Sequence, residues 1–369
     1  MRVLITGGAG FIGSHTADRL LELGYQVRVM DSYETPVHPK GMVPSYLDPR
    51  IERSHGSVTC KDWLLAAMKN CDVILHLAAF QDYLPQFSKF VDVNVSSTAR
   101  IYELIVKHNF PIKKIVVASS QAAMGEGLYK TKTGRKVFPN MRLEDDLRNA
   151  IWEPKGPKGM KWAPSDETVS NPQNPYGMSK IAEEMFALHL GKRYNIPTVA
   201  LRYSIVQGSR QSFYNAYSGA CRIFSLAFHQ GNEPPIYEDG NQIRDFVNIH
   251  DVVDANILTM ENSRADYEVF NVGGGKAITV KDFAKVVADV YGRIDYEPVA
   301  CGRYRFGDTR HIFSDISKLK RLGWEPKRTV QDSVVEYKEW LDSADSVDNI
   351  VEYCTKQMQK LNVVREVNA

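Results

Sequence analysis

The sequence has few cysteines and no long apolar run. Its five cysteines are scattered over 369 residues and are odd in number. None has the spacing of a C-x-x-C pair or of a zinc ligand set, so we expect free thiols and no metal site. No apolar run approaches the ~20 residues that cross a membrane. No signal-peptide pattern precedes the first apolar strand, which favours a cytoplasmic location.

The sequence also lacks a large excess of either positive or negative charge. Lysine and arginine together number 46, aspartate and glutamate 44, and the net charge is +2. A global field that would attract nucleic acid or an anionic membrane is therefore not expected, although a local cationic site is compatible with these numbers. The hydrophobic content of 43% and charged content of 24% are ordinary for a globular protein.

Short apolar runs alternate with segments of helical spacing in the first half of the chain. Near-continuous β-branched strands separated by helices are typical of a parallel sheet covered on both faces. The pattern predicts strands at 3–5, 26–31, 73–77, 115–119 and 198–203, and helices at 14–23, 63–68, 93–108 and 179–194.

The first strand ends in a glycine turn, Gly7-Gly8-Ala9-Gly10-Phe11-Ile12-Gly13. Gly7 permits the tight turn, Gly10 allows close approach of a pyrophosphate, and Gly13 lets the next helix pack closely. A helix N-terminus at this turn would offer free N–H groups to phosphates. Asp31 ends the second strand, where it suits ribose hydroxyls and opposes a 2′-phosphate. We therefore expect NAD bound to a Rossmann-type sheet; the alternatives are a plain βα turn and a solvated Asp31.

Composition changes in the second half suggest the domain plan. We expect residues 1–203 to form the NAD-binding domain, joined by 240–262. Residues 204–239 and 263–345 are expected to form a smaller C-terminal substrate-binding lobe, followed by a C-terminal helix and tail at 346–369. The stretch from about 125 to 175 mixes charges, Pro and Gly, and it predicts a long loop or lid.

A tyrosine and a lysine four residues apart, Tyr176 and Lys180, follow Asn174-Pro175 at a predicted helix start. Positions i and i+4 share one helix face, so the ammonium group would favour the phenolate. A phenolate can accept a hydroxyl proton while a hydride moves to NAD. Ser120 ends a parallel strand at the ligand-binding edge, and it could bond the same substrate oxygen. Chance spacing and serine capping are the alternatives.

These motifs together resemble the extended short-chain dehydrogenase/reductases that act on nucleotide sugars, over about residues 1 to 341. The resemblance rests on Thr6–Gly13, Asp31, His76–Ala79, Asn94, Ser119–Ser120, Tyr176 with Lys180, Arg244–Val247 and Asn271–Gly273. It implies NAD contacts at Gly7, Gly10, Phe11, Ile12, Gly13, Asp31, Leu77, Ala78, Ala79, Asn94, Tyr176, Lys180 and Tyr203. It also implies a catalytic set of Ser120, Tyr176 and Lys180.

The resemblance implies a nucleotide-diphosphate sugar as substrate. Arginine suits the planar, bidentate contacts of a diphosphate. The expected substrate contacts are Ser119, Ser120, Gln121, Arg210, Asn215, Tyr217, Arg244 and Arg305. Surface ion pairs are the alternative for the arginines, and loop packing is the alternative for Asn215 and Tyr217.

The two residues after Ser120 suggest the reaction. Dehydratases and decarboxylases of the family carry a glutamate here and 3,5-epimerases a cysteine, whereas this chain has Gln121 and Ala122. That favours a 4-epimerase. The 119–127 segment, the long insertion after it and the 209–219 segment resemble dTDP-L-rhamnose 4-epimerases, which suggests a dTDP- or UDP-linked (6-deoxy)hexose. Alternatives are a nucleotide-sugar dehydrogenase/reductase, a dehydratase, or a cofactor-binding regulatory protein.

Three positions depart from the family pattern. Ile205 replaces the usual asparagine of Arg-Tyr-Phe-Asn, Met124 replaces a tyrosine, and Ile312 stands where glucose-specific epimerases have a gating tyrosine. The helices at 94–108 and 179–194 carry apolar faces, and the resemblance implies a homodimer through a four-helix bundle.

Overall fold

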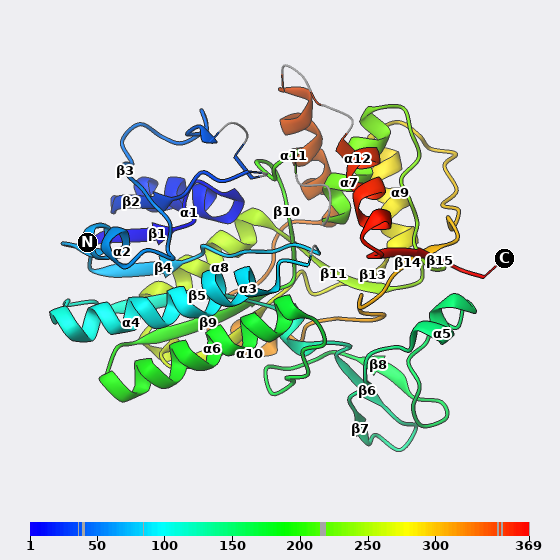
Figure 1. Cartoon of the computed structure of the whole chain (residues 1–369), viewed down its shortest axis with the longest axis horizontal. Helices are drawn as coiled ribbons and strands as arrows, with labels where there is room; N and C mark the ends of the chain where they lie inside the picture. Colours follow the sequence, from blue (N-terminus) through cyan, green and yellow to red (C-terminus); the bar gives the residue numbers. More distant parts are fainter. Residues whose placement is uncertain are drawn as a thin grey trace.

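A parallel sheet forms the centre of the molecule (Figure 1). The computed structural model describes residues 1–35, 37–38, 41–83, 85–214, 219–344, 347 and 350–368. The seven parallel strands of the sheet lie in the order β12-β9-β5-β4-β1-β2-β3. From β1 the chain adds β2 and β3 on one side and then crosses over to add the later strands on the other side. This change of side opens a crevice at the carboxyl ends of β1 and β4. This confirms the doubly wound Rossmann-type sheet. Its strands are β1 (Arg2–Thr6), β2 (Gln26–Asp31), β3 (Glu52–His55), β4 (Val73–His76), β5 (Lys114–Ser120), β9 (Thr198–Tyr203) and β12 (Glu268–Val272).

Both faces of the sheet are buried, which explains its near-continuous apolar strands. Alternate side chains of a strand point to opposite faces, so Val3 and Ile5 join one core cluster while Leu4 joins the other. The first cluster packs against α1 (Phe11–Glu22) and α8 (Ile249–Glu261). The second packs against α2 (Lys61–Met68), α4 (Ser97–His108) and α6 (Pro175–Tyr194). Among the described residues, no helix is long and apolar enough to cross a membrane.

A smaller lobe carries its own core. A three-stranded sheet, β10-β11-β13, packs with its helices around aromatic residues, and the rings of Phe246 and Phe283 stack with centroids 4.3 Å apart. Its elements are β10 (Ile205–Gln207), β11 (Ile243–Asn248), β13 (Ala277–Thr279), α7 (Ala220–His229), α9 (Val280–Val290), α11 (Val330–Asp342) and α12 (Ile350–Lys360). The shorter helices α3 (Phe87–Phe90), η2 (Val91–Ser96), η3 (Gln121–Met124), η4 (Ser263–Ala265) and α10 (Ser317–Lys320) connect the larger elements.

The structure corrects the predicted domain boundaries. β11, at 243–248, belongs to the lobe sheet and not to the NAD-binding domain, although α8 after it returns to the central sheet. β12, at 268–272, was assigned to the lobe but pairs in parallel with β9 of the central sheet. The partner of a strand is set by contacts far along the chain, so the local pattern of these residues did not identify it.

The C-terminal residues fold back onto the lobe. β15 (Val364–Glu366) pairs antiparallel with β14 (Arg303–Arg305), and Val364 lies opposite Arg305 with its own side chain buried. The predicted C-terminal helix is α12, but the expected tail is an ordered strand of the lobe.

The long loop predicted for about 125–175 is a folded unit. An antiparallel sheet with the order β7-β6-β8 and a short helix stand beside the lobe (Figure 1). Their bounds are β6 (Leu128–Lys130), β7 (Lys136–Val137), β8 (Lys161–Ala163) and α5 (Glu144–Arg148). Leu128 and Val169 form a small core with Met124 and Ile312. Strands of two or three residues are too short to show alternation, so the sequence pattern missed them.

Candidate active site

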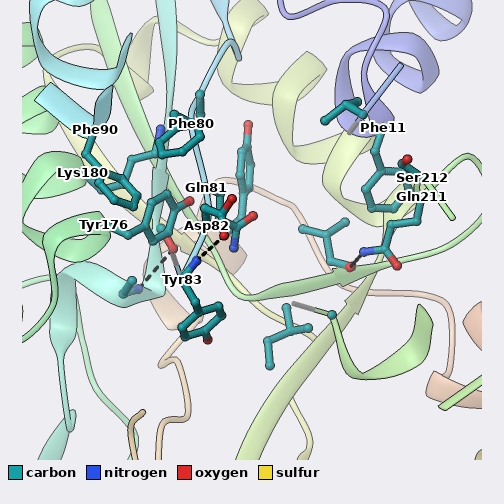
Figure 2. Close-up of a pocket in the computed structure, with 18 of the residues that line it drawn as sticks. Phe11, Phe80, Gln81, Asp82, Tyr83, Phe90, Tyr176, Lys180, Gln211 and Ser212 are labelled. Atoms are coloured by element: carbon teal, nitrogen blue, oxygen red, sulfur yellow. Dashed lines mark hydrogen bonds between the residues drawn. The ribbon is translucent and has the colours of Figure 1, made fainter. Parts of the chain in front are cut away.

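A cavity of about 780 Å³ lies at the crevice between the central sheet and the lobe. That volume is within the usual range of small-molecule and cofactor sites. Figure 2 shows Tyr176 and Lys180 on one side, with the loop from Phe80 to Tyr83 beside them and Phe11 across the space. The cavity is therefore lined by both halves of the molecule.

Steric limits explain Gly7 and Gly13 of the turn. Gly7 has φ +66°, and a Cβ there would lie 2.7 Å from the Cα of Ala78. A Cβ on Gly13 would lie 2.4 Å from the carbonyl oxygen of Gly7, so Gly13 packs the helix onto the turn itself. Gly10 is the N-cap of α1 and makes no side-chain cap bond. The first amides of α1 therefore stand open where an anion can bind.

Asp31 lines the cavity and also fixes the glycine turn. Its Oδ2 accepts a hydrogen bond from the Ala9 N–H at 3.0 Å, and its Oδ1 accepts one from the Tyr33 N–H at 3.0 Å. The turn and the carboxylate are thus held in one arrangement, next to the open helix N-terminus.

The predicted cofactor residues gather at one cavity, with one exception. Gly7, Gly10, Phe11, Ile12, Gly13, Asp31, Leu77, Ala78, Ala79, Tyr176, Lys180 and Tyr203 all line it. The hydroxyl of Tyr203 donates to Asn256 Oδ1 at 2.7 Å, so this hydroxyl is engaged within the protein. An open helix N-terminus, a glycine-rich turn and an adjacent carboxylate fit a dinucleotide.

Asn94 is the exception and needs a correction. It is fully buried in the π-helical segment η2 and does not line the cavity. Its Oδ1 accepts from the Phe80 N–H at 2.7 Å, and its Nδ2 donates to the Phe80 carbonyl at 3.0 Å and to Ser179 Oγ at 2.8 Å. Asn94 therefore ties the loop after β4 to α6, and both N–H groups of its amide are donated within the protein.

The sequence Asn174-Pro175-Tyr176-Gly177 starts α6 at the cavity. The Asn174 side chain accepts from the Gly177 N–H at 2.8 Å, and Pro175 occupies the first turn, where no N–H is needed. A Cβ on Gly177 would lie 2.4 Å from the Ala122 carbonyl oxygen, so this glycine lets α6 approach η3. Tyr176 and the residues after Ser120 are brought together in this way.

Lys180 lies one turn beyond Tyr176, with its Nζ 6.0 Å from the centre of the tyrosine ring. The Nζ donates to the Ala118 carbonyl at 2.7 Å and to Glu183 Oε2 at 2.7 Å. Lys180 is almost completely buried, so its position is fixed between β5 and α6. The predicted pairing of the phenol with an ammonium group is present.

The end of β5 supplies Ser119, Ser120 and Gln121. Ser120 Oγ accepts from the Ala122 N–H at 3.1 Å and caps η3, while its residue lines the cavity. Ser119 also lines the cavity, and its Oγ donates to Glu184 Oε2 at 2.9 Å. Gln121 lines the cavity, and within the described part of the chain its buried Oε1 has no hydrogen-bond partner.

The predicted arginines lie at two ends of the cavity. Arg305 is buried between the rings of Tyr83 and Tyr237, 4.7 and 5.2 Å from their centres. Arg244 is held by the carbonyl oxygens of residues 243, 309 and 310. Arg210 instead bonds Asp18 of α1 at 2.7 Å and stacks on Tyr46, whose hydroxyl donates to the Ala9 carbonyl. Arg210 thus lies beside the glycine turn. Asn215 and Tyr217 lie outside the described residues.

Comparison with known proteins assigns the chain to a family. A family model described as the NAD dependent epimerase/dehydratase family matches residues 3–143 and 150–273. This chain belongs to the NAD-dependent epimerase/dehydratase family. The match confirms the predicted resemblance and the predicted cofactor, NAD.

Relatives of this family member share most of its length. It is 34% identical to dTDP-L-rhamnose 4-epimerase of Burkholderia thailandensis, covering 92% of this chain and 94% of the relative. It is 30% identical to a putative UDP-glucose 4-epimerase of Methanocaldococcus jannaschii, with 92% and 98% covered. The crystal structure of a Thermotoga maritima UDP-glucose 4-epimerase with UDP-glucose superposes with a TM-score of 0.76 at 30% identity, covering 93% and 99%. These comparisons confirm the prediction of an NAD-dependent nucleotide-sugar epimerase as an enzyme class.

Several cavity residues of this family member were not predicted. The loop after β4 contributes Phe80 and Tyr83, and α7 contributes Arg222. Nearby Asp308 raises the pKa of Tyr83 to about 12. The C-terminal segment contributes Met358 and Val363. The position of the loop directly after a predicted strand could have identified Tyr83, whereas the C-terminal residues carry no local signal for a site.

Proposed function

We propose that this chain is a 4-epimerase of nucleotide-diphosphate sugars in which Tyr176 is the proton acceptor and donor. One observation carries the proposal. Tyr176, Lys180 and Ser120 line the same cavity, and the two residues after Ser120 carry no ionisable group. A dehydratase must remove a second proton from the sugar, and neither Gln121 nor Ala122 can do so.

The protein groups of the mechanism act on one hydroxyl. NAD held at the glycine turn and Asp31 would supply a reversible hydride acceptor for the sugar. Tyr176 as phenolate takes the proton from the O4 hydroxyl, and it gives the proton back when the opposite configuration forms. Lys180 stabilises the phenolate by its charge. Ser120 bonds the same oxygen and orients it. No net oxidation occurs, so the cofactor stays with the protein between turnovers.

The proposed substrate is a dTDP- or UDP-linked hexose, with a 6-deoxyhexose as the first choice. The similarity to a dTDP-L-rhamnose 4-epimerase over 92% of the chain supports this choice. Arg244 and Arg305 line the lobe end of the cavity, opposite the glycine turn, and arginine is suited to a diphosphate. Apolar Ile312 also lines the cavity, where glucose-specific relatives would have a tyrosine.

The test is a panel of dTDP- and UDP-sugars given to the purified protein in D₂O. We expect one sugar to be converted to its C4 epimer with no added NAD, no rise in NADH absorbance and no solvent deuterium in the product. Tyr176→Phe should lower kcat by about 10²- to 10⁴-fold, the usual contribution of a positioned acid–base group. Deuterium uptake would indicate a dehydratase or a 3,5-epimerase, and stoichiometric NADH with a released ketosugar would indicate an oxidoreductase.

The proposal includes a cytoplasmic homodimer. Large apolar side chains stay exposed along α6 and the segment packed beside it: Phe87, Val91, Met178, Met185 and Phe186 are each at least 45% exposed. α4 and α6 lie side by side (Figure 1). A second copy bringing the same pair would bury these residues in a four-helix bundle.

A further inference from the structure

Lys180 shares its buried position with a carboxylate that the reaction does not use. Glu183 is fully buried on α6, and its Oε2 accepts from Lys180 Nζ at 2.7 Å. Within the described residues, its other oxygen, Oε1, has no hydrogen-bond partner. Glu183 does not line the cavity, so it lies behind Lys180 and cannot reach a substrate.

Among the described residues, Lys180 is the cation that bonds Glu183. Glu184, the next residue, is neutralised by Arg202 through bonds of 2.7 and 2.9 Å. Tyr203 of β9 faces Glu183 with a phenol whose pKa burial raises. His76 of β4 faces Lys180, and burial lowers its pKa to about 3, so it is neutral. Burial also raises the pKa of Glu183 to about 7.

We propose that Glu183 is a positioning residue that holds the Lys180 ammonium and sets the pH at which Tyr176 gives up its proton. Glu183 acts on Lys180 directly, because the Lys180 ammonium group bonds both Glu183 and the Ala118 carbonyl at 2.7 Å. Lys180 passes this effect to Tyr176, since the same ammonium group lies 6.0 Å from the centre of the tyrosine ring.

The sign of the effect follows from charge. Lys180 favours the phenolate form of Tyr176, whereas Glu183 opposes that form at pH values above its own pKa of about 7, where it is ionised. Removing the negative charge while keeping an acceptor oxygen should therefore let Tyr176 lose its proton at lower pH. The bond to Ala118 should keep Lys180 in place in such a variant.

The experiment compares Glu183→Gln and Glu183→Asp with the unaltered chain. In Glu183→Gln, the acidic limb of the pH profile of kcat/KM should move to lower pH by about 0.5 to 1 unit. Glu183→Asp keeps the charge and should restore the original limb. A limb that stays in place in folded Glu183→Gln, or that moves to higher pH, overturns the inference. Because Glu126 is also buried with a pKa of about 7, a limb moved by Glu126→Gln and not by Glu183→Gln overturns it too.

A second measurement separates this inference from the proposed function, on which it rests for the role of Tyr176. The tyrosinate absorbance of the ligand-free protein is titrated with and without Tyr176→Phe, so that the difference reports Tyr176 alone. The midpoint should be lower in Glu183→Gln by the same amount. An unchanged midpoint in an active epimerase removes the inference and leaves the function. A lowered midpoint in a chain that epimerises no tested sugar supports the inference and removes the function.

Discussion

The stacked position of Arg305 gives a prediction at the scale of one residue. Its guanidinium lies between two tyrosine rings, and its Nε is buried without a hydrogen-bond partner among the described residues. Lysine keeps the charge but has neither the planar fork nor the stacking face. Arg305→Lys should raise KM for the nucleotide sugar about 10- to 100-fold, the equivalent of about 1.5–3 kcal/mol for charged hydrogen bonds. Steady-state kinetics with bound NAD quantified would measure this.

The matched control is Arg303→Lys. Arg303 lies on the same strand, β14, but does not line the cavity. It should change KM less than about 2-fold, as expected for a surface substitution. Equal effects of the two substitutions would show that the strand, and not the Arg305 contact, supports binding.

Glu126 gives a prediction about stability and pH. Its carboxyl is 1% exposed, and burial raises its pKa from 4.5 to about 7. The folded state binds this proton more tightly than the unfolded state does. The stabilising contribution of Glu126 to the free energy of unfolding is therefore present below pH 4.5 and is lost as pH rises through 7. Glu126→Gln should remove a fall in the free energy of unfolding on the order of 3 kcal/mol between pH 5 and 8. Urea unfolding at both pH values would test this.

Asp239→Asn is the control for that measurement. Asp239 accepts a hydrogen bond from the side chain of Arg310, and the backbone N–H of Arg310 donates to Glu126. Unlike that of Glu126, the pKa of Asp239 is lowered, to about 2, by its hydrogen bond with Arg310. Asp239 is thus ionised at both pH 5 and pH 8, and its substitution should leave the difference between them unchanged. If both variants flatten the pH dependence equally, the titrating group is not Glu126.

The sequence motifs predicted the location of the site residues better than they predicted the hydrogen-bond partners of each side chain. The glycine turn, Asp31 and the Tyr176–Lys180 pair lie together as expected, because each is tied to a local turn or helix. Asn94 and Ser119 instead bond Phe80 and Glu184. Those partners are distant in sequence, and a motif does not show which of two polar groups a side chain will choose.

At the scale of elements, the C-terminal strand supports the lobe end of the cavity. Val364 of β15 is buried and lies opposite Arg305 of β14. A buried unpaired charge at this position should displace β15 and, with it, Arg305. Val364→Asp should raise KM for the nucleotide sugar at least 10-fold and lower stability by about 2–5 kcal/mol, while NAD content stays the same. Glu366→Gln, exposed on the same strand, should change neither. Loss of NAD binding in Val364→Asp would contradict this separation.

Element length decided which parts of the fold were predictable. The long strands and helices of the central sheet were expected at nearly their observed positions, since continuous apolar runs and a period of 3.6 are visible over several residues. β7 and β14, with two and three residues, give no such signal. β12 was assigned to the lobe, because its pairing with β9 depends on contacts about 70 positions away in sequence.

At the scale of the whole molecule, the site exists only where the two units meet. The central sheet supplies the glycine turn, Tyr176 and Lys180, and the lobe supplies Arg244 and Arg305 to the same cavity. Opening at this junction would separate the acid–base pair from the diphosphate arginines. We therefore expect substrate binding to depend on the lobe and NAD binding to depend mainly on the sheet.

The exposed apolar residues of α6 give the prediction for the assembly. Met185 is 55% exposed, and a two-fold axis through the α4–α6 face would bury it once from each copy. Burial of the exposed half of a methionine contributes about 0.8–1.5 kcal/mol, and burial of an unpaired carboxylate costs several kcal/mol more. Because the dimer would contain two copies of Met185→Glu, this variant should weaken the dimer by at least about 100-fold. Sedimentation at micromolar concentration should show a dimer for the unaltered chain and a monomer for this variant. Ile294→Glu, 80% exposed in the lobe, should stay dimeric. A monomeric unaltered chain, or a dimer lost only in Ile294→Glu, would place the interface elsewhere or remove it.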